Sequence, residues 1–86
     1  MTAPTQINLL NHHAAKRLRQ LRERLKLSRP KFATLLGIPP TTLKNYELGY
    51  REIGGGLFLL IAHHPELKQH IDWLLTGAPA TPEMQA

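Results

Sequence analysis

Residues 29–46 read RPKFATLLGIPPTTLKNY, and this stretch decides the fold. Ser28 precedes it and is a good helix cap, because its hydroxyl can accept a hydrogen bond from an unpaired amide of the first turn. Proline is tolerated in that first turn, and Gly37 ends the helix because glycine readily adopts the left-handed conformation. Pro40 then opens a second helix, since proline suits the first helical position. The stretch therefore predicts two short helices joined by a tight turn.

Three residues at the junction of the two helices have the properties that such a pair of helices needs. Ala33 is small enough for two helices to cross, Gly37 tolerates the positive φ of the turn, and Leu43 pins the second helix to the first. Ile38 and Tyr46 complete the apolar seam. With that seam buried, the polar side chains of the second helix face outward and can enter a major groove; they are Thr41, Thr42, Lys44 and Asn45. This arrangement is a helix-turn-helix.

Helical periodicity continues on both sides of this motif. An apolar stripe at Ala14, Leu18, Leu21 and Leu25 predicts a helix from residue 8 or 11 to residue 26. A fourth helix is expected over residues 57–63. A fifth should start at Pro65 and bury Leu67, Ile71 and Leu74 before Gly77 ends it.

No alternating β pattern occurs, so the fold is predicted to be all-α: a compact five-helix bundle with the helix-turn-helix formed by helices 2 and 3. Residues 1–7 are expected to form a flexible lead, residues 8–77 the domain and residues 78–86 a flexible tail. A chain of 86 residues with 42% hydrophobic content suits one domain.

The basic charge is concentrated in the first half of the chain. Residues 16–51 contain ten Lys or Arg against two acids, which is a balance of +8, whereas the remaining residues balance to −3. A basic half of this kind is expected of a protein that binds a polyanion such as nucleic acid.

Several other functions find no support in the composition. The absence of cysteine excludes a disulfide framework and agrees with a reducing, cytoplasmic location. No apolar run reaches membrane-spanning length, and we expect no signal peptide. The five histidines lack a completing carboxylate, so no metal site is predicted. The acids are too scattered for acid–base catalysis, and no glycine motif for phosphate cofactors is present, so we expect no enzyme activity, cofactor or small-molecule ligand.

Three blocks together resemble the XRE family, the helix-turn-helix proteins of the Cro and phage-repressor type. They are LRQLRERLKLS at residues 18–28, NYELG at residues 45–49 and IDWLLTG at residues 71–77. Their order and spacing resemble the family over roughly residues 14–77. Three positions depart from the pattern: Pro39 stands where a capping Ser or Thr is usual, Pro40 where a polar base reader is common, and Lys26 where a glycine is common.

The resemblance implies roles for named residues. The base-facing set is Pro40, Thr41, Thr42, Lys44 and Asn45, and the phosphate-facing set is Arg17, Arg29, Lys31, Tyr50 and Arg51. Arg22 and Glu47 resemble a structural ion pair of the family that links helix 1 to the end of the recognition helix. A dimer surface is expected on helices 4 and 5, from exposed members of Leu57, Phe58, Leu67, His70 and Leu75.

The function that these roles imply is a homodimeric repressor that binds double-stranded DNA at an inverted repeat. Autoregulation of a phage or mobile-element operon is the expected setting, with repression responding to protein concentration. An alternative is an antitoxin-type module that binds DNA and neutralises a protein partner, although residues 76–86 offer only Met84 as a hydrophobic anchor. A further alternative is an RNA- or nucleoid-binding protein with little sequence preference.

Overall fold

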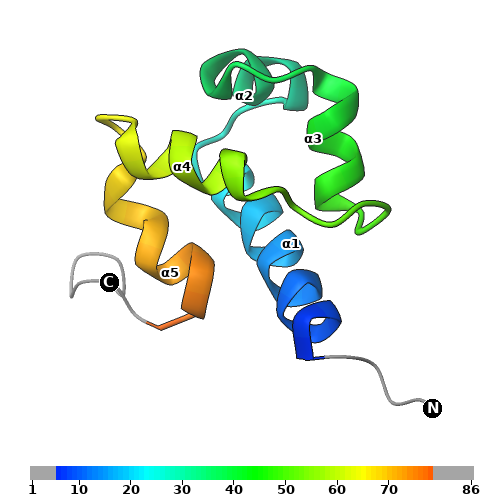
Figure 1. The fold of residues 1–86 in the computed structure, drawn as a ribbon. Helices are drawn as coiled ribbons and strands as arrows, with labels where there is room; N and C mark the ends of the chain where they lie inside the picture. The colour runs from blue at the N-terminus through cyan, green and yellow to red at the C-terminus, as the bar shows by residue number, and fades with distance from the viewer. Residues whose placement is uncertain (1–5, 79–86) are drawn as a thin grey trace. The chain divides into compact units, whose positions relative to one another are not determined.

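The computed structural model describes residues 6–78. Over this range the chain forms five α-helices, one short 3-10 helix and no strands. The helices are α1 (Gln6–Arg24), α2 (Arg29–Leu36), α3 (Pro40–Glu47), α4 (Gly55–His63) and α5 (Ile71–Thr76), with the 3-10 helix η1 (Lys68–His70) before α5 (Figure 1). The all-α prediction is confirmed. No helix within residues 6–78 combines the length and apolarity that crossing a membrane requires.

The described residues divide into two compact units, one up to Ile53 and one from Gly54 onward. The first unit contains α1, α2 and α3. In it, α3 packs against both α2 and α1, and the joint residues Ala33 and Leu43 are fully buried. The two short helices with their tight turn are therefore the predicted helix-turn-helix, formed by α2 and α3.

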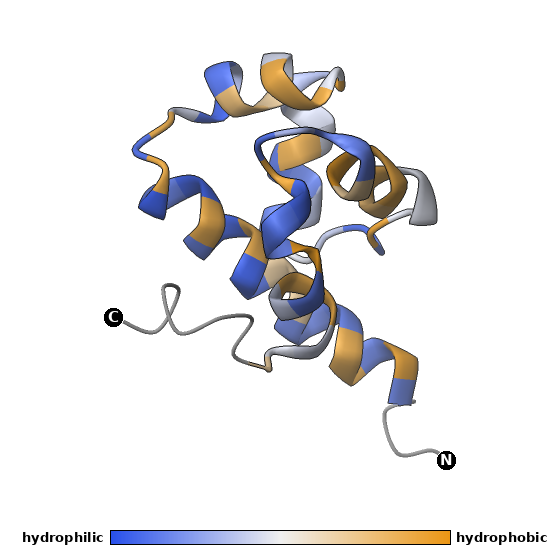
Figure 2. Cartoon of the chain, turned by 90° about the vertical axis from the view of Figure 1, so that its left-hand side faces the viewer, coloured by the Kyte–Doolittle hydropathy of each residue, from blue (hydrophilic) through white to orange (hydrophobic). Residues whose placement is uncertain are grey.

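The long helix α1 has the apolar stripe that its periodicity predicts. Ala14, Leu18 and Leu21 are buried, and Figure 2 shows hydrophobic and hydrophilic bands alternating along this helix. Its bounds differ from the prediction at both ends, because it starts at Gln6 and stops at Arg24 rather than Lys26. It stops early because Lys26 adopts a positive φ of 60°, which turns the chain toward α2.

The second unit contains α4, η1 and α5, which contact one another. Ile61, Leu67 and Leu74 are buried in it. Helix α5 begins at Ile71, so the prediction of a regular helix from Pro65 is wrong. The chain turns more tightly there: the His64 carbonyl accepts hydrogen bonds from the amides of both Leu67 and Lys68, and the next bond joins His70 to Leu67 with the spacing of a 3-10 helix.

Candidate nucleic-acid interface

The outward face of α3 carries most of the predicted base-facing side chains. Leu43 and Tyr46 are buried and fix which way the helix is turned. Pro40, Thr41 and Lys44 are consequently exposed. Thr42 and Asn45 lie at the edges of this face and are half-buried.

The start of α3 lacks the usual side-chain cap. Pro39 is extended there, with φ −64° and ψ 144°, and no side chain bonds to the free amides of the first turn. The start of α2 differs, because the Ser28 hydroxyl accepts a hydrogen bond from the Lys31 amide at 3.3 Å. The capping role predicted for Ser28 is thus confirmed. Lys31 itself projects from this end of α2 and is exposed.

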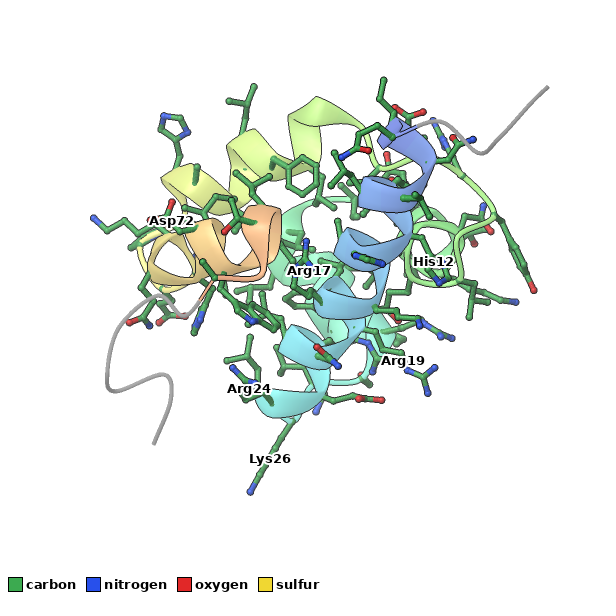
Figure 3. All side chains as sticks on the ribbon, turned by 90° about the horizontal axis from the view of Figure 1, so that it is seen from below. His12, Arg17, Arg19, Arg24, Lys26 and Asp72 are labelled. Atoms are coloured by element: carbon green, nitrogen blue, oxygen red, sulfur yellow. The ribbon has the colours of Figure 1, made fainter. Side chains whose placement is uncertain are left out.

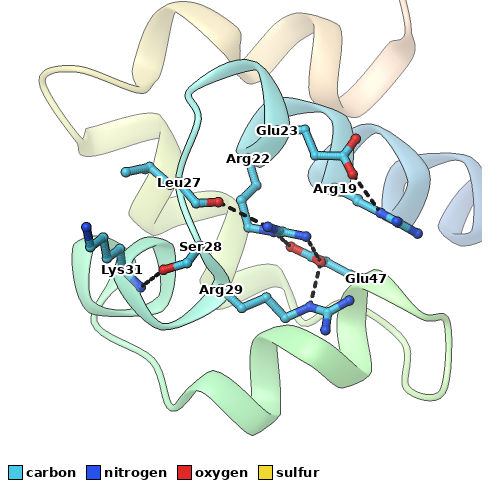
Figure 4. A network of polar contacts seen from close by, with 8 residues as sticks. All are labelled: Arg19, Arg22, Glu23, Leu27, Ser28, Arg29, Lys31 and Glu47. Atoms are coloured by element: carbon cyan, nitrogen blue, oxygen red, sulfur yellow. Dashed lines mark hydrogen bonds and ion pairs between the residues drawn. The ribbon is translucent and has the colours of Figure 1, made fainter.

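A buried carboxylate joins the three helices of the first unit. The Glu47 side chain has no exposed surface and lies between two arginines (Figure 4). Arg22 donates from Nε to Oε2 at 2.7 Å and from Nη2 to Oε1 at 3.2 Å, while its Nη1 donates to the Leu27 carbonyl at 3.0 Å. This is the ion pair expected between α1 and the end of α3.

Arg29 is a third member of this network that sequence reasoning missed. Its Nε donates to Glu47 Oε1 at 2.9 Å, and 30% of its side chain stays exposed. The bond leaves the two terminal nitrogens of the guanidinium for other partners (Figure 4). Eighteen residues separate Arg29 from Glu47, so no local spacing rule could have found the pair.

Two more predicted phosphate-facing residues follow the end of α3. Gly49, with φ 76°, lets the chain turn away from the helix. Tyr50 is 74% exposed. The guanidinium of Arg51 lies over the ring of Tyr46, 5.6 Å from its centroid, so an aromatic face holds this cation near the helix end.

Arg17 lies apart from the rest of the predicted phosphate-facing set. It projects from a side of α1 other than the side of His12 and Arg19 (Figure 3). Its side chain is half-buried, and this desolvation lowers the pKa of its guanidinium. The helix face that meets the end of α3 carries other residues, because the hollow at that junction is lined by His12, Lys16 and Arg19.

The predicted dimer surface needs correction. Leu57, Leu67 and His70 are buried and Phe58 is half-buried, so of the named residues only Leu75 is exposed. Leu57 and Phe58 belong to α4, whereas Leu67 and His70 belong to the turn and 3-10 helix before α5. The large hydrophobic residues that the second unit exposes are Leu59, Leu60 and Leu75.

Within residues 6–78, no three histidine, aspartate or glutamate side chains lie together in a way that could hold a metal ion.

A comparison with protein families finds one match: residues 18–68 fit the family described as HTH_3: Helix-turn-helix. This stretch contains α2 and α3 with all the predicted base-facing residues. No curated protein and no solved structure matches the chain.

Proposed function

Because this chain belongs to the XRE-type helix-turn-helix family and is therefore a DNA-binding transcription regulator, we propose that it is a homodimeric repressor reading an inverted repeat through the major groove. The observation that carries this proposal is the outward face of α3. A docked helix that buries Leu43 and Tyr46 while it exposes Thr41 and Lys44 presents a polar edge to a duplex.

The chemistry of that face suits direct reading of bases. A threonine methyl packs on the methyl group of thymine, and asparagine can form two hydrogen bonds with adenine. Lys44 can reach guanine or a nearby phosphate. Pro40 donates no hydrogen bond from its backbone, so it contributes apolar contact alone and sequence reading begins at Thr41.

Phosphate contacts supply most of the affinity in this proposal. Arg29 offers its two terminal guanidinium nitrogens beside the start of α2, where free amides and the helix dipole already favour an anion. Further contacts along the sugar–phosphate backbone of the DNA come from Lys31, Tyr50 and Arg51. Binding of this kind weakens steeply as salt rises, because phosphate contacts release counterions.

Two copies are required because one helix-turn-helix reads only a few base pairs. Half-sites about one helical turn apart would each take one copy. The exposed leucines of the second unit, Leu59, Leu60 and Leu75, are the surface that we assign to the dimer. A repressor of this type in a phage or mobile element would regulate its own operon and respond to protein concentration.

Selection of bound fragments from the source genome, followed by footprinting, tests the proposal. We expect duplex fragments that share an inverted repeat, protected in two segments about one helical turn apart. Equal binding of unrelated duplexes would contradict sequence reading, and a single protected segment would contradict the dimer.

The double variant Thr41→Ala, Thr42→Ala tests the base-facing role. A good base contact contributes about 1–3 kcal/mol, so the loss of two threonine contacts should reduce operator affinity by about tenfold or more. Binding to unrelated DNA should not change. The matched control is Thr34→Ala, which removes an exposed threonine of α2. Affinities come from titration of labelled duplexes, and thermal melting checks that each variant is folded. If the double variant still prefers the operator over unrelated DNA as strongly as the wild type does, the base-facing role of these threonines is refuted.

A further inference from the structure

One face of α1 carries a row of polar residues beside the end of the recognition helix. A helix advances about 100° per residue, so positions 12, 16, 19 and 23 fall within about 60° of one another. Together with Ala15 and Gln20, they line a hollow of about 390 Å³ whose other wall is Glu47, Leu48 and Gly49 at the end of α3. We call this hollow the basic hollow.

The charged side chains around the basic hollow are arranged so that an anion can bind there. Glu47 is already bound by Arg22 and Arg29, so its negative charge is compensated. Arg19 pairs with Glu23 at 3.0 Å, but both side chains are more than half exposed, and such a pair is weak. Lys16 makes no ion pair with any residue in the described range 6–78.

We propose that the basic hollow binds a backbone phosphate of the operator, through Lys16 and Arg19. The inference rests on the proposed function, because α3 lying in a major groove brings the sugar–phosphate strand that borders the groove toward the helix end. Tyr50 and Arg51 project from the same end of α3, so the basic hollow continues their phosphate contacts onto α1. A lysine supplies a compact charge and an arginine a two-pronged donor, and both bind phosphate oxygens.

The basic residues of α1 lie on two different faces of the helix. Around the helix, Arg17 lies about 100° from Lys16 and about 160° from Arg19, and Arg24 lies about 80° and about 140° from them. Figure 3 shows Arg17 and Arg24 on the opposite side of α1 from His12 and Arg19. The phosphate contact of α1 therefore moves from Arg17, where the family resemblance puts it, to Lys16 and Arg19.

Four single variants that each change one charge on α1 test the inference. Lys16→Gln and Arg19→Gln should each weaken binding to the selected operator about two- to tenfold, the range of one ordinary hydrogen bond at an exposed site. Each should also lower the slope of log affinity against log salt by about one. Glu23→Gln should have the opposite effect and strengthen binding, because it removes the acid that competes for Arg19. Arg24→Gln is the matched control and should leave both affinity and slope near wild type.

Arg17→Gln decides between the two faces. We expect it to change the salt slope no more than Arg24→Gln does. A loss of slope in Arg17→Gln with none in Lys16→Gln and Arg19→Gln would overturn the proposal, and so would equal losses in all four arginine and lysine variants. Melting curves confirm that each variant is folded before its affinity is compared.

Neutral methylphosphonate linkages placed one at a time along the operator locate the contact. One such linkage should weaken wild-type binding and weaken Lys16→Gln less, because only Arg19 then remains to contact that phosphate. If every linkage weakens both proteins alike, the basic hollow holds no phosphate. Failure of the proposed function looks different, since no operator would be selected or the Thr41→Ala, Thr42→Ala variant would bind it normally.

Discussion

Two glutamates on neighbouring helices show how burial decides the value of an ion pair. Glu47 is fully buried and accepts from two arginines on two other helices. Glu23 meets Arg19 on the same helix surface, with 54% of its side chain exposed. Removing one partner of a buried pair leaves an uncompensated charge in a site of low dielectric, whereas water screens an exposed charge.

The stability of Glu47→Gln should therefore fall far more than that of Glu23→Gln. We expect about 3 kcal/mol of lost stability for the first, because two arginines lose their counter-charge. For the second we expect less than about 0.5 kcal/mol, the range of an exposed pair one helical turn apart. Urea denaturation followed by circular dichroism measures both. Similar losses in the two variants would mean that Glu47 contributes through packing rather than through its charge.

At the scale of elements, the three helices of the first unit end in the same way. In each, one amide bonds to a carbonyl five residues back and the preceding amide to a carbonyl three residues back. This pair of bonds requires a left-handed residue one position before the last donor. Gly37 and Gly49 supply it for α2 and α3, but Lys26 supplies it for α1 with φ 60°. A side chain in that conformation is strained, so Lys26 weakens the turn between α1 and α2.

Substitutions at two of these helix ends should change stability in opposite directions. Lys26→Gly should stabilise the protein by about 0.5–1 kcal/mol, since relief of the strain exceeds the entropy cost of glycine. Gly37→Ala should destabilise it by about 1 kcal/mol; a Cβ there meets nothing within 4 Å, so the cost comes from the backbone alone. Thermal melting of the two variants beside wild type measures the shifts. A destabilised Lys26→Gly would indicate that the lysine side chain contributes a contact that outweighs the strain.

At the scale of the whole molecule, the two units differ in charge: the first is strongly basic and the second is not. The basic residues of positions 16–51 belong to the first unit, whose strong positive charge favours DNA and disfavours a second copy of itself. Helix α4 of the second unit has no Asp, Glu, Lys or Arg and exposes Leu59 and Leu60. Self-association through the second unit therefore avoids the repulsion between two basic surfaces, which supports the dimer that we propose.

The variant Leu59→Glu, Leu60→Glu tests this division. Like charges on the shared surface should shift the protein to a monomer and weaken binding to the full inverted repeat, while affinity for an isolated half-site stays near wild type. Analytical ultracentrifugation gives the oligomeric state and duplex titration the affinities. Ile7→Glu, Leu10→Glu is the matched control, because it charges two exposed apolar residues of α1 in the first unit. A dimer that survives the α4 change but not the α1 change would move the interface to α1.

The sequence alone determined the helix-turn-helix, because the signals for it are local. A cap at Ser28, a left-handed glycine at residue 37, a proline at residue 40 and apolar spacing all act within a few residues, and they identify which face of α3 is polar. Such signals predict less at the start of α5, where bonds three residues apart replace the regular helix. Tertiary structure alone decided that Arg29 shares Glu47 with Arg22, and that Lys16 rather than Arg17 faces the end of α3. Those outcomes depend on how helices distant in sequence are rotated against one another, and the sequence of a single helix does not indicate that rotation.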